Sequence, residues 1–195
     1  MAVDQTTLRL GEADHGRPVT ADEFAEAMFE EPWQYERVGG RLVVMVPDSE
    51  AHDDCTEPWL EHLIVYKLAH RDRVEKVVPE AWVRIDGQID RIGDIGVYLR
   101  PPEGVIAASR PERVPELMIE VVSGSTADRR RDYVEKKADY QGVGVAEYVV
   151  VDRFVRRLTV FTIGPDGPGE RVLGAGDVYE TPLLPGLRVA VDAIF

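Results

Sequence analysis

The stretch Glu116-Leu-Met-Ile-Glu-Val-Val122 limits what this chain can fold into more than any other. From Leu117 to Val122 every residue is apolar except Glu120, and a short run rich in Ile and Val is typical of a strand buried on both faces. A buried, ionised carboxylate is costly unless an ion pair, hydrogen bonds or a metal ion compensates it. The polar turn Ser123-Gly-Ser-Thr126 follows at the end of the strand, where ligands bind in open α/β sheets. The stretch predicts either a functional carboxylate or a structural Glu–Arg pair.

Composition bounds the class of protein. A chain of 195 residues fits one domain, which we expect over residues 18–195 after a flexible tail at 1–17. No apolar run approaches the roughly 20 residues that span a bilayer, so we expect no membrane partner. A single cysteine, Cys55, cannot form an internal disulfide, and the cytoplasm is the expected compartment. The net charge of −13 argues against loose binding to nucleic acid, but it leaves open a local basic patch or a site that carries cations.

The order of predicted elements indicates an α/β fold. Thr20-Ala-Asp-Glu23 is a capping box that begins an N-terminal helix, and Gly39-Gly40 joins two β-rich runs into a hairpin. A helix is expected to run from about Ser49 to His70, with Pro58 as its first residue or at a kink. We assign its apolar side to Trp59, Leu60, Leu63, Ile64 and Leu68. The predicted strands are 77–85, 93–99, 117–122, 147–152 and 157–163, and a charged helix covers 128–141. These elements predict a mixed β-sheet flanked by helices.

Three charged residues stand out for chemistry. Asp94 begins one predicted strand and Glu120 lies in the next, so adjacent strands could bring their carboxylates to one point. Oxygen ligands of this kind suit Mg²⁺. Lys136 lies on the helix that follows, and the order acid–acid–lysine is the one that metal-assisted phosphodiester hydrolysis requires. Because Asp, Glu and Lys are common residues, this spacing alone is a weak signal.

Several stretches resemble the Uma-two family, bacterial proteins described as putative restriction endonucleases of the PD-(D/E)XK superfamily. They run, in the order of the family, from Tyr35 to the end of the chain. They are Tyr35-Glu-Arg-Val-Gly-Gly-Arg-Leu-Val-Val-Met45, Pro47-Asp-Ser-Glu-Ala-His52, Arg91-Ile-Gly-Asp-Ile-Gly-Val97, Glu120-Val-Val-Ser-Gly-Ser-Thr126, Arg131-Asp-Tyr-Val-Glu-Lys136, Tyr140, Gly144-Val-Ala-Glu-Tyr-Val-Val-Val-Asp152 and Pro182-Leu-Leu-Pro-Gly-Leu187.

The resemblance implies a restriction-endonuclease-like fold and a set of site residues. Asp94 would be the first metal-binding acid, Glu120 the second, and the backbone carbonyl of Val121 a third ligand. The usual lysine position of the superfamily, two residues after the Glu, holds Val122, and the family pattern supplies the lysine from the next helix as Lys136. Glu36 matches a further acid near the site. The implied function is a Mg²⁺- or Mn²⁺-dependent endonuclease that acts on nucleic acid, with DNA as the expected substrate, and a homodimer as one expected assembly.

The chain departs from the family pattern at three positions. Gly93 stands where the family usually has Pro before the first Asp, Gly124 replaces the Pro after the Glu, and Pro58 interrupts a helix that is normally continuous. None of these changes removes a catalytic group.

Simpler roles remain open beside the functional ones. Glu36 could simply form an ion pair with Arg37 or Arg41 and have no role in the site. His52, which matches a Pro-Ser-x-x-His pattern, could pack locally at a helix start. The cluster 129–131 could grip phosphates or form a solvated helix face. Lys137 competes with Lys136, since adjacent helical residues point about 100° apart and only one can face the sheet. The alternative function is a non-catalytic module of the same fold that binds protein or nucleic acid in a regulatory role.

Overall fold

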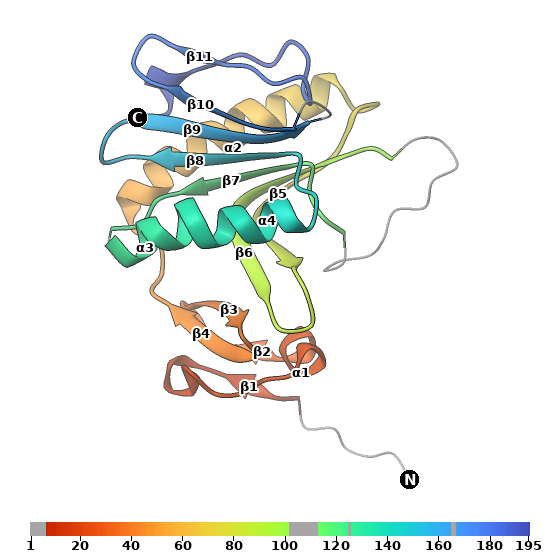
Figure 1. Cartoon of the computed structure of the whole chain (residues 1–195), viewed down its shortest axis with the longest axis vertical. Coiled ribbons are helices and arrows are strands. Elements are labelled where there is room, and N and C mark those ends of the chain that lie inside the picture. Colours follow the sequence, from red (N-terminus) through yellow and green to blue (C-terminus); the bar gives the residue numbers. More distant parts are fainter. Residues whose placement is uncertain (1–6, 102–112, 125, 165–166) are drawn as a thin grey trace. The chain divides into compact units, whose positions relative to one another are not determined.

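The structure is a computed structural model, and it describes residues 7–101, 113–124, 126–164 and 167–195. The chain divides into two compact units, whose elements are drawn in Figure 1. Unit 1 consists of Met1–Pro47 and Arg84–Ile92, and unit 2 consists of Asp48–Val83 and Gly93–Phe195. The single domain that we expected over residues 18–195 stays a prediction.

Unit 1 begins with short elements. They are β1 (Arg9–Leu10), the 3-10 helix η1 (Glu12–Asp14), α1 (Ala21–Glu26) and β2 (Met28–Phe29). β1 and β2 pair in parallel, so part of the expected flexible tail carries secondary structure, while residues 1–6 lie outside the described part. The Thr20 hydroxyl accepts the Glu23 N–H, and the Glu23 carboxylate accepts the Thr20 N–H. This is the capping box that the sequence predicted.

The rest of unit 1 is a hairpin. β3 (Gln34–Val38) and β4 (Arg41–Met45) pair antiparallel around Gly39 and Gly40. The two glycines have φ of 58° and 70°. A two-residue hairpin turn requires positive φ at both positions, and glycine adopts it without strain. The predicted hairpin is confirmed in its position and its turn. Within the same unit, β3 pairs with the first residue of β6 through Arg37 and Asp90.

Unit 2 is built on a mixed sheet. Its strands are β5 (Val74–Arg84), β6 (Asp90–Leu99), β7 (Leu117–Val121), β8 (Glu147–Asp152), β9 (Arg157–Gly164) and β10 (Gly167–Leu173), and the 84–92 ends of β5 and β6 count to unit 1. The strand order is β10-β9-β8-β7-β6, with β5 paired to β6. β7 and β8 run parallel, and the β6–β7, β8–β9 and β9–β10 pairs are antiparallel. A small second sheet pairs β11 (Val178–Tyr179) with β12 (Val189–Ala190), before the 3-10 helix η3 (Val191–Ala193). The mixed α/β fold predicted from the sequence is confirmed, with the 117–121 strand in its interior.

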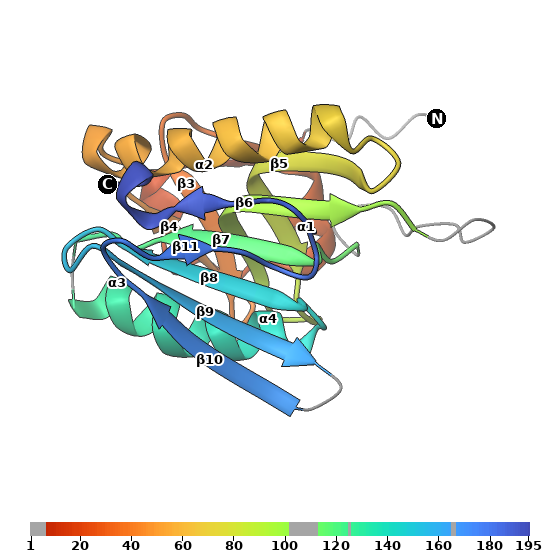
Figure 2. The ribbon, with the colours of Figure 1, turned by 90° about the horizontal axis from the view of Figure 1, so that it is seen from above.

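Helices cover both faces of this sheet. α2 (Glu50–Ala69) lies on one face, and a continuous helical segment lies on the other, as Figure 2 shows. That segment consists of α3 (Thr126–Arg130), the π-helix η2 (Arg131–Lys136) and α4 (Lys137–Gly142). Leu117, Ile119 and Val121 of β7 belong to the apolar core that includes α2. Because side chains alternate along a strand, Glu120 points to the opposite face, which η2 covers.

Helix α2 corrects one sequence interpretation. It runs from Glu50 to Ala69 with Pro58 inside it, so the helix does not start at Pro58, and the alternative of a kink there stays a prediction. Its buried stripe is His52, Cys55, Trp59, Leu63 and Tyr66. Ile64 and Leu68, which we placed on the apolar side, are 46% and 55% exposed because they lie on the neighbouring stripe. Among the described residues, no helix is both long and apolar enough to cross a membrane.

Candidate metal and catalytic site

The register of two strands places Asp94 beside Glu120. β6 and β7 pair antiparallel with Ile95 opposite Ile119, and Asp94 and Glu120 are the next residues outward on the two strands. Asp94 Oδ2 accepts the backbone N–H of Val121 at 2.5 Å, which ties the Asp94 carboxylate to the end of β7. The two predicted acids and Val121 therefore lie together in unit 2.

Glu120 is 3% exposed and is paired with Lys136, which is 2% exposed. The Lys136 ammonium donates to Oε1 of Glu120. The other oxygen, Oε2, is buried and accepts no hydrogen bond from any residue that the structure describes. Burial raises the pKa of Glu120 well above its ordinary value, and the negative charges of Asp94 and Asp132 raise it further, against the lowering effect of Lys136.

The structure distinguishes the two candidate lysines. Lys137 Nζ lies 3.8 Å from the centre of the Phe161 ring and 3.9 Å from a carboxylate oxygen of Glu170. Lys136, one residue earlier, points to Glu120 instead. The helix register that we inferred from the sequence therefore agrees with the observed contacts.

Sequence reasoning did not include Asp132, which is fully buried at the same place. Its Oδ1 accepts from Nε of Arg131 at 3.0 Å, while Oδ2 is buried with no hydrogen bond from the described residues. Burial raises the pKa of Asp132, Asp94 raises it further, and Lys136 and Arg131 lower it. Its spacing of four residues from Lys136 is the signal that could have found it, since residues four apart share a helix face.

A second group of ligand atoms surrounds Asp94. One oxygen of Asp48, one ring nitrogen of His52 and one oxygen of Asp94 all lie within 4.8 Å of one another. His52 Nε2 is 3.0 Å from Asp94 Oδ2, and His52 Nδ1 is 3.7 Å from Asp48 Oδ2. Burial alone would lower the pKa of His52, but the hydrogen bond to Asp94 and the nearby carboxylates raise it above its ordinary value. His52 thus contacts a predicted metal ligand, and Asp48, for which the sequence predicted no role in the site, joins it.

This donor set fits a divalent cation. The carboxylates of Asp94, Glu120 and Asp132 repel one another, and two of them keep a buried oxygen without a hydrogen bond from the described residues. Oxygen ligands suit Mg²⁺, and a neighbouring imidazole also suits Mn²⁺ and heavier transition metals. Asp94 and Glu120, with Asp48 and His52 at the side, are the residues that could hold such an ion.

Glu36 and the arginine cluster have partners of other kinds. Glu36 lies in unit 1, where Oε2 accepts from Arg91 at 2.8 Å and Oε1 accepts the Ile92 N–H at 3.2 Å. Arg91 is thus a partner of Glu36 that the sequence did not predict, and the role of Glu36 near the site stays a prediction. In the 129–131 cluster, Arg129 pairs with the buried carboxylate of Asp152, Arg130 with Glu135 and Arg131 with Asp128 and Asp132. These pairs hold the arginines on carboxylates of the chain.

Gly93 has a packing reason. A Cβ at this position would lie 2.3 Å from Sδ of Met118 and 3.0 Å from the hydroxyl of Tyr140. A proline, which carries the same Cβ, would force the Met118 side chain to move. The departure from the family pattern before Asp94 is therefore matched by the bulk of Met118.

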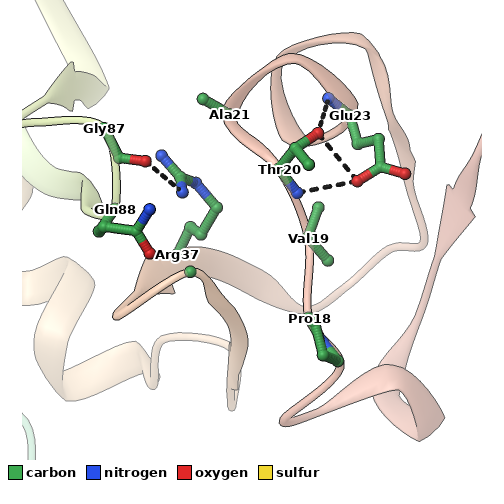
Figure 3. A pocket seen from close by; sticks show the side chains of 9 residues that line it. Pro18, Val19, Thr20, Ala21, Glu23, Arg37, Gly87 and Gln88 are labelled. Carbon is green, nitrogen blue, oxygen red and sulfur yellow. Dashed lines mark hydrogen bonds between the residues drawn. The ribbon is translucent and has the colours of Figure 1, made fainter.

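Unit 1 contains a pocket of about 460 Å³, shown in Figure 3. Thr20, Glu23, Arg37, Gly87 and Gln88 contribute its polar lining. The Thr20 and Glu23 groups bond to each other, and Nη1 of Arg37 donates to the Gly87 carbonyl at 3.0 Å. These bonds cap α1 and brace the turn before β6, which are structural roles.

Comparison with known proteins places this arrangement in a class. The crystal structure of a putative nuclease belonging to DUF820 from Anabaena variabilis ATCC 29413 matches with a TM-score of 0.68, covering 91% of this chain and 98% of that one. At 17% sequence identity the match shows a shared fold, so the molecule is an α/β protein of nuclease-like fold. No curated protein matches the sequence. The family profile of Uma2, described as "Putative restriction endonuclease", matches residues 21–192, and the chain belongs to this family.

Proposed function

We propose that this chain is a divalent-cation-dependent endonuclease that hydrolyses phosphodiester bonds of nucleic acid, with DNA as the substrate. The observation that carries the proposal is the cluster of Asp94, Glu120 and Lys136, in which the partly exposed Asp94 lies opposite the buried pair of Glu120 and Lys136. Membership of a family described as "Putative restriction endonuclease" supports the same reaction class. Mg²⁺ or Mn²⁺ is the proposed cofactor.

Each residue of the cluster has a proposed task. Asp94, Glu120 and the backbone carbonyl of Val121 would hold the cation, which when bound would polarise the scissile phosphate and lower the pKa of a bound water. Lys136 holds its ammonium near the attacking water and the phosphate oxygens, where negative charge develops. His52 orients Asp94 through their 3.0 Å contact, and Glu36 is a further acid proposed from the family pattern.

The site also suggests a setting for the protein. A net charge of −13 disfavours loose attraction to nucleic acid, so we propose that binding depends on the cation. We propose a cytoplasmic protein, and a homodimer as its assembly. The same charge favours a second candidate, a non-catalytic module that keeps the fold and binds protein or nucleic acid as a regulator.

Calorimetric titration with Mn²⁺ and Mg²⁺ separates the two candidates. We expect the wild type to bind one of these ions and Asp94→Asn to lose most of the binding heat. An endonuclease should also cut circular DNA in the presence of that ion, with linear DNA and RNA substrates as further arms. Lys136→Met should abolish cutting while Lys137→Met, the matched control, retains it. Ion binding without cutting of any of these substrates would favour the regulatory module.

A further inference from the structure

The partner of Lys136 poses a problem for a cation at Glu120. The Lys136 ammonium is bound to Oε1 of Glu120, and both side chains are buried. A divalent cation bound by the same carboxylate would repel the ammonium strongly at such short range and low polarity. A buried ammonium without a counter-charge is costly, so Lys136 needs another acceptor in the same place.

Asp132 meets the requirements for that acceptor. It lies four residues before Lys136 on η2, so the two side chains share a helix face, and both are buried. Its Oδ1 is bound to Arg131, but Oδ2 is buried and has no hydrogen bond from the described residues. A buried acceptor left without a hydrogen bond destabilises the fold, and a hydrogen bond from Lys136 would satisfy it. Asp132, Lys136 and Glu120 also interact electrostatically with one another.

We propose that Lys136 exchanges partners, leaving Glu120 for Oδ2 of Asp132 when Glu120 binds a divalent cation. Asp132 is therefore a positioning residue, which acts through Lys136 and does not touch the substrate. The exchange requires only rotation of a long, flexible side chain, because the backbone of η2 already holds both residues. It keeps Lys136 charged and inside the site after the cation enters. The inference rests on the proposed function, because that function supplies the cation.

A double-mutant cycle tests the exchange through binding of Mn²⁺, measured by calorimetry. The proteins are wild type, Asp132→Asn, Lys136→Met and the double variant. Asn keeps the shape of Asp132 and an oxygen for Arg131. We expect Asp132→Asn to weaken Mn²⁺ binding by about tenfold when Lys136 is present and by less than about twofold in the Lys136→Met background. Asp128→Asn is the matched control, since Asp128 also contacts Arg131, and it should change the affinity in neither background.

Two results of this cycle would overturn the proposal. Equal weakening in both backgrounds would make Asp132 a direct ligand of the ion. No weakening in either would leave Asp132 as a structural partner of Arg131.

A second series, without metal, covers the case in which Lys136→Met does not fold. Glu120→Gln removes the charge that holds Lys136, so the ammonium should already rest on Asp132. Adding Asp132→Asn should then lower Tm by about 5 °C more than it does in the wild type. An equal effect in both backgrounds would contradict the exchange. Failure of the wild type to bind Mn²⁺ would refute the proposed function and the cation as trigger, whereas this series judges the partner exchange by itself.

Discussion

In unit 1, each buried carboxylate meets arginine. Asp90 is bound by Arg37 at 2.7 Å and by Arg84 at 2.9 Å, and Glu36 is bound by Arg91 at 2.8 Å. In unit 2, Glu120 pairs with the buried ammonium of Lys136, Asp132 with the partly exposed Arg131, and Asp94 with the ring of His52. The comparison shows that a buried acid is not by itself a sign of catalysis. What distinguishes the second region is that Glu120 and Asp132 each keep one buried carboxylate oxygen without a hydrogen bond from the described residues.

The largest loss of unfolding free energy is expected in unit 1, where arginines neutralise the buried carboxylates. Arg37→Met removes a buried partner of Asp90, and breaking such a pair typically costs about 3–5 kcal/mol of unfolding free energy. Urea denaturation should show this loss equally with and without Mn²⁺. Arg41→Met is the control. Arg41 is exposed, and its guanidinium donates a hydrogen bond to the Gly16 carbonyl. Because this contact lies at the surface, its loss should cost less than about 1 kcal/mol. Recovery of the Arg37 variant by Mn²⁺ would erase the distinction between the two regions.

A matched pair of Glu→Gln substitutions should give an intermediate effect. Glu36→Gln weakens a charged pair with Arg91, and we expect a loss of about 2–3 kcal/mol at every Mn²⁺ concentration. Glu120→Gln relieves the repulsion with Asp94 and Asp132, so without metal it should stay within about 1 kcal/mol of the wild type. It should also lose most of the rise in Tm that Mn²⁺ gives the wild type. The Mn²⁺ response of Glu36→Gln is a further readout: a reduced response would place Glu36 among the ion-binding groups.

The smallest change in stability is expected at Glu147, a buried carboxylate that accepts hydrogen bonds from two hydroxyl groups. Glu147 is 2% exposed and accepts from Tyr179 and Thr181. Burial raises the pKa of Glu147 above 4.5, against the lowering effect of these hydrogen bonds. A folded-state pKa above the unfolded one means that stability is lost as pH rises from the unfolded pKa through the folded pKa. Glu147→Gln cannot titrate, so relative to the wild type it should gain stability as the pH rises from about 4, near the unfolded pKa, toward 7. Thermal melts across that range check this, and a constant difference between the two proteins would contradict it.

The features that the sequence predicted well depend on local rules. The capping box at Thr20 and the turn at Gly39-Gly40 follow from a few neighbouring residues, and so does the buried strand around Glu120. The site was predicted in part: a family pattern pointed to Asp94, Glu120 and Lys136, which the structure brings together. Their catalytic roles stay predictions.

The features that the sequence missed depend on tertiary packing. Asp48, His52 and Asp94 meet because α2 packs against the sheet, and no spacing in the chain encodes that contact. The exposed Ile64 shows the same limit, since hydrophobic character alone could not tell which stripe of α2 faces the core. The arginine partner of Glu36 lies far along the chain, at Arg91.

Because η2 is a π-helix, the number of residues between Glu120 and Lys136 affects whether the two side chains meet. A π segment carries an extra residue within an otherwise α-helical run, and α3 and α4 flank it on both sides. Deleting one residue from 131–136 would let the run close as a plain α-helix, and because the π segment had absorbed the extra residue, the lysine beyond the deletion would still face Glu120. A second deletion would have no extra residue to remove and would turn the lysine by about 100° around the helix axis, away from Glu120. The first deletion should therefore leave the ion pair in place and the second should break it without unfolding the protein, whereas changes at the exposed Val134 should be tolerated.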